Sequence, residues 1–409
     1  MSSSFSRITN INASKLQRVI LIHRHGDRCP GIFGSQDVKE TKSWLKKLNP
    51  DSVDKSILAK FPINSKHPES PKQTEPPVGR LTQRGAQQLT SLGEAIKSRY
   101  LNITTHPTVW SSNYHRTVQS AGYFLHGLQA AAGTQIRVRK ENECVIDPFS
   151  RYKRIHEVTA EMAKSNLFHE HEVTHRLDTV RNELSAMPCF NFEPFLEATH
   201  DATKLSSKLV SPKPFQWFHA VDVLTCHDRH PDVHKPSAIA KLMPNTAVCE
   251  QYMLWRFLEY YKNKEVLRLS CGDLLSELMQ LERSIEEEKR EEKREEKREK
   301  EVPLTVFSGH DVTVFPLAIA FGHRWTEWPG YACHLVVEVY EDDEDDEEST
   351  RFRVLLNEGA RNQNGSGRGD GDGDGAAGLA QDELTVIGDF YGWSEFNQIL
   401  ADVMAGECD

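Results

Sequence analysis

The sequence predicts an α/β fold in which a central, mostly parallel sheet carries helices on both faces. Short apolar runs at 19–22, 108–112 and 304–309 indicate buried strands, because they are rich in β-branched or aromatic residues. Helical patterns follow the second and third of these runs. Strands that alternate with helices are typical of sheets covered on both sides. In such sheets, binding sites form just beyond the carboxyl ends of the strands.

The helices are predicted from caps and apolar spacing. Thr82 is suited to an N-cap, and apolar residues then recur at helical spacing through 82–100: Leu89, Leu92, Ile96 and Tyr100. A second helix is expected after Asn113, taken as its N-cap, with Val118, Ala121, Leu125 and Leu128 on one side. Further along, 334–340 and 351–357 are predicted to be an antiparallel strand pair.

Two other stretches have weaker patterns. Residues 36–80 are rich in Lys, Pro and Ser, which favours an irregular connection. Residues 140–240 show helical patches and no clear strands, and we expect a helical subdomain there.

The domain organisation follows from these patterns. The α/β core is predicted to be discontinuous, over 15–35, 79–139 and 240–409. Cap insertions are predicted at 36–78 and 140–239. Three low-complexity segments are expected to be solvated insertions: 286–301, 341–348 and 362–378. The first of these could form a projecting helix or a frayed one.

Composition excludes several classes of protein. The 409 residues carry a formal net charge of −10, which argues against the basic face that broad nucleic-acid binding requires. No run of about 18 apolar residues occurs, so no membrane-spanning helix is expected. The N-terminal segment has no apolar run of signal-peptide length, and we expect a cytoplasmic protein. The eight cysteines form no C-x-x-C pair, which favours reduced thiols over disulfides.

The residues that follow the first strand suggest a chemistry. Arg24 and Arg28 flank His25, and two guanidinium groups form a cationic receptor suited to phosphate. Gly26 would let the backbone approach a ligand closely. A histidine among arginines is hard to protonate, and a neutral imidazole can attack phosphorus. The alternative is two surface arginines beside a capping histidine.

Two further strand-to-helix junctions carry matching residues. Arg116 lies about one turn into the helix after Asn113, where the helix N-terminus favours an anion. His310 and Asp311 follow the strand at 304–309, and a carboxylic acid there could protonate the leaving oxygen of a phosphate ester. The alternatives are an exposed arginine and an aspartate that merely caps its helix.

These segments resemble the histidine acid phosphatases, the second branch of the histidine phosphatase superfamily. "RHGDRCP" at 24–30 is similar to the R-H-G-x-R-x-P signature of that family. Five more segments resemble family blocks in the expected order: 79–100, 109–128, 221–236, 308–322 and 328–340.

The resemblance implies a phosphoglycerate-mutase-like α/β core, a mainly helical cap and a phosphate pocket between them. It implies that His25 is a nucleophile that forms a phosphohistidine, and that Asp311 is the acid that protonates the leaving alcohol. It implies that the phosphoryl oxygens are held by Arg24, Arg28, Arg116 and His310. The substrate would be a small-molecule phosphomonoester, and no metal or cofactor is implied.

Three other functions deserve comparison. A non-catalytic protein of this fold could bind a phosphate ligand, and a phytase-like enzyme could cleave inositol phosphates. "HEVTH" at 171–175 matches the H-E-x-x-H zinc pattern, in which Glu172 would be the base and His169 a nearby third nitrogen. The match is short and no downstream ligand stands out, so we expect a structural histidine cluster there. A second cluster, His227, His230 and His234, is interpreted in the same way.

Overall fold

The structure is a computed structural model. It describes residues 16–33, 37–64, 78–186, 195–198, 207–210, 215–292, 301–341, 350–359 and 384–405. Its centre is an eight-stranded sheet in the order β11-β10-β9-β1-β8-β4-β5-β3. The strands are β1 Leu16–Arg24, β3 Ile63–Asn64, β4 Thr108–Ser111, β5 Ile136–Val138, β8 Leu304–Gly309, β9 His334–Glu341, β10 Thr350–Asn357 and β11 Thr385–Tyr391.

Strand β1 lies where two halves of the sheet meet. On one side it pairs in parallel with β8, and β4, β5 and β3 continue the parallel half. On the other side it pairs antiparallel with β9, and the antiparallel pairs β9–β10 and β10–β11 complete the sheet. The expected antiparallel pair of β9 and β10 is therefore present.

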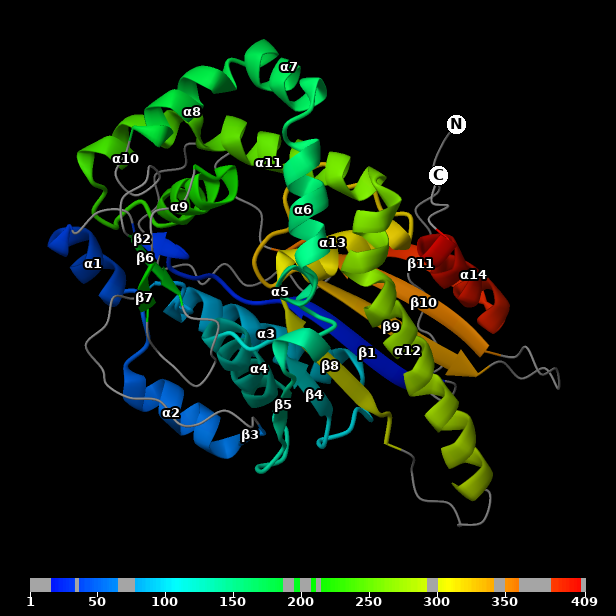
Figure 1. Cartoon of the computed structure of the whole chain (residues 1–409). Helices are drawn as coiled ribbons and strands as arrows, with labels where there is room; N and C mark the ends of the chain where they lie inside the picture. The colour runs from blue at the N-terminus through cyan, green and yellow to red at the C-terminus, as the bar shows by residue number, and fades with distance from the viewer. Residues whose placement is uncertain are drawn as a thin grey trace, which may run out of the picture.

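Helices cover both faces of the sheet, as Figure 1 shows. Val19 and Leu21 of β1 face a core shared with α3 Gln83–Arg99 and α4 His115–Leu128. Ile20 and Ile22 face the opposite core, which is shared with α11 Thr246–Lys262, α12 Lys264–Glu292, α13 Asp311–Ala320 and α14 Gly392–Ala405. Because successive side chains of a strand point to opposite faces, the continuous apolar run of β1 fits a strand buried on both sides. The predicted α/β class is confirmed.

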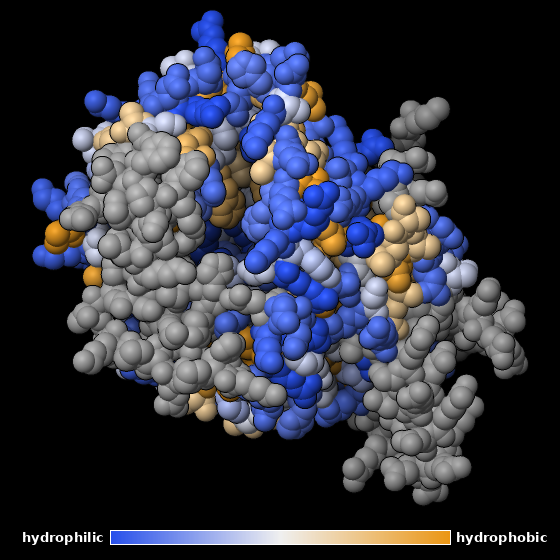
Figure 2. Space-filling model, in the orientation of Figure 1, coloured by the Kyte–Doolittle hydropathy of each residue, from blue (hydrophilic) through white to orange (hydrophobic). Residues whose placement is uncertain are grey.

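A mainly helical layer lies next to the core. It contains α5 Pro148–Arg151, α6 Lys153–Met162, α7 Asn166–Thr174, α8 Leu177–Ser185, α9 Trp217–Arg229 and α10 Ser237–Leu242. The expectation of no strands within 140–240 was wrong. Short strands β6 Phe195–Ala198 and β7 Ser207–Val210 pair with each other, and β6 also pairs with β2 Ile32–Phe33. Figure 2 shows that the molecular surface is hollowed between the α6 side and the α9–α11 side, with apolar residues in part of the hollow's wall.

Two other local predictions need correction. Residues 36–80 are not one irregular connection, because they include α1 Val38–Leu45, α2 Asp51–Lys60 and the edge strand β3. The carboxylate of Asp37 caps α1, accepting the backbone N–H of Lys39 at 2.7 Å. In α4 the N-cap is Tyr114 rather than Asn113. In α3 the predicted cap holds, since Thr82 Oγ1 accepts the N–H of Gly85 at 3.1 Å.

The domain boundaries stay a prediction. Of the low-complexity segments, 286–292 continue helix α12, while 293–300, 342–348 and 362–378 lie outside the described residues. In the described part of the chain, all six cysteines are buried free thiols: Cys29, Cys144, Cys226, Cys249, Cys271 and Cys333. Among the described residues, none of the helices has the length and apolarity needed to span a bilayer.

Candidate active site

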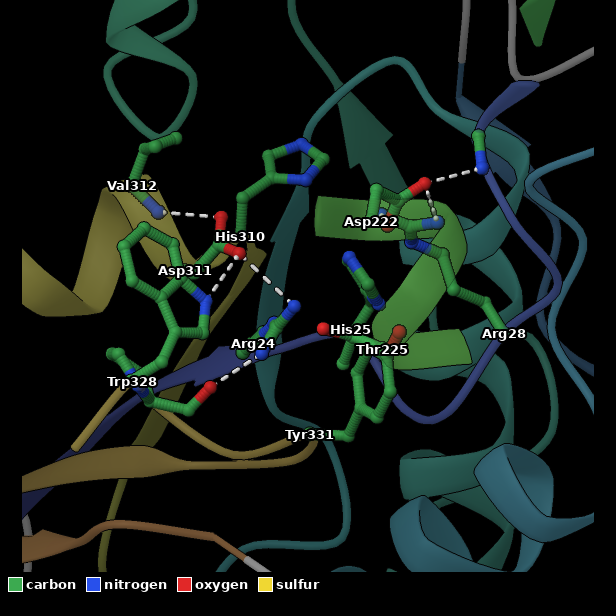
Figure 3. A network of polar contacts seen from close by, with 12 residues as sticks. Arg24, His25, Arg28, Asp222, Thr225, His310, Asp311, Val312, Trp328 and Tyr331 are labelled. Atoms are coloured by element: carbon green, nitrogen blue, oxygen red, sulfur yellow. Dashed lines mark hydrogen bonds and ion pairs between the residues drawn. The ribbon is translucent and has the colours of Figure 1, made fainter. Parts of the chain in front are cut away.

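The candidate site lies where β1, β4 and β8 end (Figure 3). The backbone N–H of His25 donates to the carbonyl of Gly309 at 2.9 Å, and Ala332 N–H donates to the carbonyl of His25 at 3.1 Å. The loop after β1 is thereby tied to the end of β8 and to the segment just before β9. This is the strand-end location that the sequence predicts for a binding site.

Gly26 is needed for packing at this loop. A Cβ atom at Gly26 would lie 2.4 Å from the carbonyl oxygen of Gly85, which belongs to the first turn of α3. The sequence suggested that Gly26 lets the backbone approach a ligand. In the structure, the backbone of Gly26 instead lies close to helix α3. Only glycine fits such a contact without displacing the helix.

Asp27 fixes the same loop through hydrogen bonds to Thr82 and His230. Its carboxylate accepts hydrogen bonds from Thr82 Oγ1 at 2.5 Å and from His230 Nε2 at 2.6 Å. Burial alone would raise the pKa of Asp27, but these partners outweigh burial and lower it. His230 follows α9, so the loop after β1 is held by the helical layer as well as by the core.

His25 has a defined tautomer. Its Nδ1 lies 2.8 Å from the carbonyl oxygen of Gly26, which can only accept, so Nδ1 carries the proton and Nε2 is the basic nitrogen. Burial, and then the positive charges of Arg116, Arg24 and Arg28, hold the pKa of His25 well below its usual range. The imidazole is therefore neutral at neutral pH.

Three arginines surround this imidazole. Their guanidinium groups contact other side chains but keep some hydrogen-bond donors without a partner among the described residues. Arg24 pairs with Asp311 at 3.0 Å and donates to the carbonyl of Pro329. Arg116 lies over the ring of Tyr114, at 4.2 Å from its centroid, and burial lowers its pKa to about 10. The Nε–H groups of Arg24, Arg28 and Arg116 are buried, and none has a hydrogen-bond partner among the described residues. Buried donors without partners are costly, and an anion would satisfy them.

His310 and Asp311 complete the site at the start of α13. The rings of His310 and His25 meet edge to face, with centroids 5.6 Å apart. Ser112 Oγ lies 2.8 Å from His310 Nε2, and Arg116 lies 3.5 Å from His310 Nδ1. Asp311 faces the site through its pair with Arg24. The structure thus brings all six predicted residues into one cluster, in which Arg116 is half-buried and the other five are buried.

The sequence missed four neighbours of these residues. Asp222 of α9 accepts two hydrogen bonds from Arg28, and Tyr331 lies beneath Arg24, with its centroid 4.3 Å from the guanidinium carbon. Trp328 donates to Asp311, and Ser112 contacts His310. Asp222, Ser112, Trp328 and Tyr331 all lie in segments that carry the family resemblance. Their contacts cross long stretches of chain, so sequence spacing alone could not assign them.

The H-E-x-x-H segment has a structural role. Glu172 accepts hydrogen bonds from Trp217 Nε1 at 3.0 Å and from the hydroxyl of Tyr252, and it pairs with Arg181 at 3.2 Å. Within the described ranges, no group of three or more His, Cys, Asp or Glu side chains could hold a metal ion.

The second histidine cluster also joins parts of the fold. His227, His230 and His234 each contact a carboxylate, respectively Glu40, Asp27 and Asp37. These carboxylates belong to the loop after β1 and to α1 with its cap. The cluster therefore links the end of α9 to the N-terminal part of the chain, as expected for structural histidines.

A buried histidine among three guanidinium groups, with a carboxyl group beside it, is an arrangement whose charge suits a phosphate ligand. Comparison with known proteins gives its family. The family model for the histidine phosphatase superfamily (branch 2) matches residues 15–357. The chain belongs to this family, and the enzyme class predicted from the sequence, histidine acid phosphatase, is confirmed.

Individual relatives are distant. The lysosomal acid phosphatase of Bos taurus is 24% identical over 345 residues, which cover 81% of this chain and 69% of that protein. The lysophosphatidic acid phosphatase type 6 of Bos taurus is 21% identical over 351 residues, covering 81% of this chain and 75% of that protein. The Bifidobacterium longum multiple inositol polyphosphate phosphatase, solved with inositol hexasulfate, has the same fold with a TM-score of 0.52 and 13% identity, covering 87% of this chain and 88% of that one.

Proposed function

We propose that the protein hydrolyses phosphomonoesters through a phosphohistidine at His25, with Asp311 as general acid. Nε2 of His25 attacks phosphorus while the bond from phosphorus to the leaving oxygen breaks. The proton of the Asp311 carboxyl group goes to that oxygen. Water then attacks the phosphohistidine, the P–N bond breaks, and Asp311 takes up a proton from the water.

Electrostatic stabilisation comes from the cationic cup. Phosphoryl transfer depends mainly on positioning and on charge stabilisation at the equatorial oxygens. Arg24, Arg28 and Arg116 supply permanent positive charges around His25, and their unpartnered Nε–H groups support a role as phosphate ligands. His310 is placed to act with them. We therefore assign these four residues to phosphate binding, with no metal ion required.

The observation that carries this proposal is the tautomer of His25. Because Nδ1–H is used by the carbonyl of Gly26, the lone pair of Nε2 is available on a ring that the arginines keep neutral. A protein that only binds phosphate needs neither a free imidazole nitrogen nor a carboxyl group beside it.

Trapping the intermediate tests the proposal. The enzyme is quenched in base during turnover of p-nitrophenyl phosphate, and phosphopeptides are mapped by mass spectrometry. We expect phosphate on His25, no label in His25→Ala, and at least about a thousandfold loss of kcat in that variant. Phosphate binding without turnover would indicate the non-catalytic alternative. Turnover in a folded His25→Ala protein would refute the assigned nucleophile.

Among the described residues of 140–239, the pairing of two arginines favours a substrate with one phosphate over inositol hexakisphosphate. A polyphosphate needs several available cations beyond the catalytic cup. The arginines of "RYKR" at 151–154 pair instead with carboxylates of α12: Arg151 with Asp273 at 2.8 Å, and Arg154 with Glu265 at 2.9 Å. Turnover of sugar, lipid, alkyl and inositol phosphates, measured as kcat/KM, checks this preference.

We also keep the cytoplasmic location as a proposal. The six described cysteines are free thiols, which suits a reducing compartment. Fractionation of cells that express the chain tests it, and enrichment with lysosomal or secreted proteins would contradict it.

A further inference from the structure

One side chain outside the six predicted residues binds the carboxyl group of Asp311 directly. The indole Nε1–H of Trp328 donates to Asp311 Oδ2 at 3.2 Å, and Figure 3 shows the indole beside this carboxyl group. We propose that Trp328 is a positioning residue that holds Asp311 in the orientation from which it protonates the leaving group. The inference rests on the proposed function, in which Asp311 is the general acid.

Among the described residues, three groups donate to Asp311, and they differ in what else they do. Arg24 reaches Oδ2 at 3.0 Å, but a bound phosphoryl group competes with Asp311 for this guanidinium. The N–H of Val312 reaches Oδ1 at 2.9 Å, and it belongs to the same first turn of α13 as Asp311. The indole of Trp328 has one polar group, which can only donate. Trp328 is therefore the donor from outside α13 that substrate phosphate does not recruit.

The indole is itself held firmly. Its ring meets Phe257 of α11 edge to face, with centroids 4.9 Å apart, and lies tilted against Phe315 of α13 at 5.6 Å. The next residue, Pro329, accepts a hydrogen bond from Arg24 through its carbonyl. The turn that carries Trp328 is thus fixed against both Arg24 and Asp311. A side chain locked by packing is suited to orient a catalytic group.

The chain offers a matched control in Trp325. This residue belongs to the same turn and stacks on Phe315, with centroids 5.2 Å apart. Its Nε1–H donates to the backbone carbonyl of Phe315 at 3.1 Å. Changing either tryptophan to phenylalanine removes an indole N–H from the same aromatic cluster and keeps a ring. Only Trp328→Phe removes a donor to the carboxyl group of Asp311.

The test compares leaving groups. We expect Trp328→Phe to lower kcat for an alkyl phosphate roughly tenfold more than kcat for p-nitrophenyl phosphate, since the alkoxide needs protonation. Asp311 becomes a carboxylate as it gives up its proton, and the loss of one hydrogen bond to a charged group is of this size. KM should change little for both substrates. Trp325→Phe should leave the ratio of the two kcat values unchanged. In an Asp311→Asn background, Trp328→Phe should cause no further loss.

Several results would overturn the inference. Equal losses for both substrates, or a full additional loss in the Asp311→Asn background, would show that Trp328 does not act through the acid. A lower melting temperature of Trp328→Phe with an unchanged kcat ratio would point to packing alone. An inactive wild-type protein would remove the proposed function and this inference with it. If the wild type is active and the loss of kcat depends on the leaving group in Asp311→Asn but not in Trp328→Phe, the proposed function stands and only this inference fails.

Discussion

Arg28 donates two hydrogen bonds to Asp222, at 3.1 and 2.7 Å, and so joins the loop after β1 to helix α9. Asp222 also accepts the backbone N–H of Gly31 at 2.6 Å. Burial alone would raise the pKa of Asp222, but Arg28 and this N–H lower it. The pair fixes one wall of the proposed phosphate site before any substrate arrives, which is a form of preorganisation.

The variant Asp222→Asn should weaken both folding and phosphate binding. Removing one partner of a buried ion pair leaves the other charge uncompensated and costs about 3 kcal/mol of unfolding free energy. Urea unfolding measures this loss, and inhibition by inorganic phosphate should weaken in parallel. The control is Asp389→Asn, since Asp389 pairs with Arg351 on an exposed part of the sheet edge, where such pairs contribute under about 1 kcal/mol. Equal effects of the two variants would argue against a special role for Asp222.

The variant Asp311→Asn should slow poor leaving groups most. An amide cannot deliver the proton, so kcat for an alkyl phosphate should fall by about two orders of magnitude or more, whereas p-nitrophenolate leaves without protonation and should lose much less. Steady-state kinetics on both substrates give the comparison. Parallel losses would mean that Asp311 has a role other than general acid.

The folded protein should lose stability in mild acid. Burial lowers the pKa values of His23 and His334 from 6.5 to about 4. Between pH 6.5 and pH 4 these two imidazoles are therefore protonated in the unfolded chain but not in the folded protein. The free energy of unfolding consequently falls as the pH drops from 6.5 toward 4. Each histidine contributes up to about 3 kcal/mol to this fall. Urea unfolding at intervals from pH 7 to 4.5 measures the slope, and His334→Asn should reduce it. A flat profile in the wild type would contradict the prediction.

Glu172 should contribute to the stability of the fold and have no role in zinc-dependent catalysis. Its carboxylate holds Trp217, Tyr252 and Arg181 together, so Glu172→Ala leaves buried donors unpaired and should lower the melting temperature by several degrees. We expect kcat for p-nitrophenyl phosphate to stay within about twofold at a temperature where the variant is folded, because Glu172 does not touch the site. Loss of activity in a folded variant, or inactivation of the wild type by a chelator, would reopen the metal hypothesis.

Elements could be predicted from the sequence where a few neighbouring residues are enough to decide them. The apolar run of β1 and the cap of α3 at Thr82 could be recognised because burial on both faces and capping each need only a few neighbouring residues. The cap of α4 was misplaced by one residue. Tyr114 has the extended backbone of an N-cap without any side-chain cap bond, so its type gave no signal.

Contacts between distant segments could not be predicted in the same way. Strands β6 and β7 are short and pair with each other, and β6 also pairs with β2. Strand propensity is a weak signal for such short strands, because their pairing partners decide whether they form. The six predicted site residues are close together because parallel strands end at one edge, which the fold class implies. Asp222 and Trp328 come from a cap helix and a late turn, and their partners are set by packing that no local pattern encodes.

The pairing of β1 has a consequence for how the chain acquires its fold during synthesis. Val19 is paired with Leu304 on one side and with Glu338 on the other. The strand that leads to His25 is therefore translated long before its partners β8 and β9. It stays unpaired until both of them have been made. Such long-range pairing slows folding and leaves an apolar strand unprotected meanwhile. A nascent chain stalled before residue 304 should consequently depend on chaperones, because neither partner strand of β1 has been made.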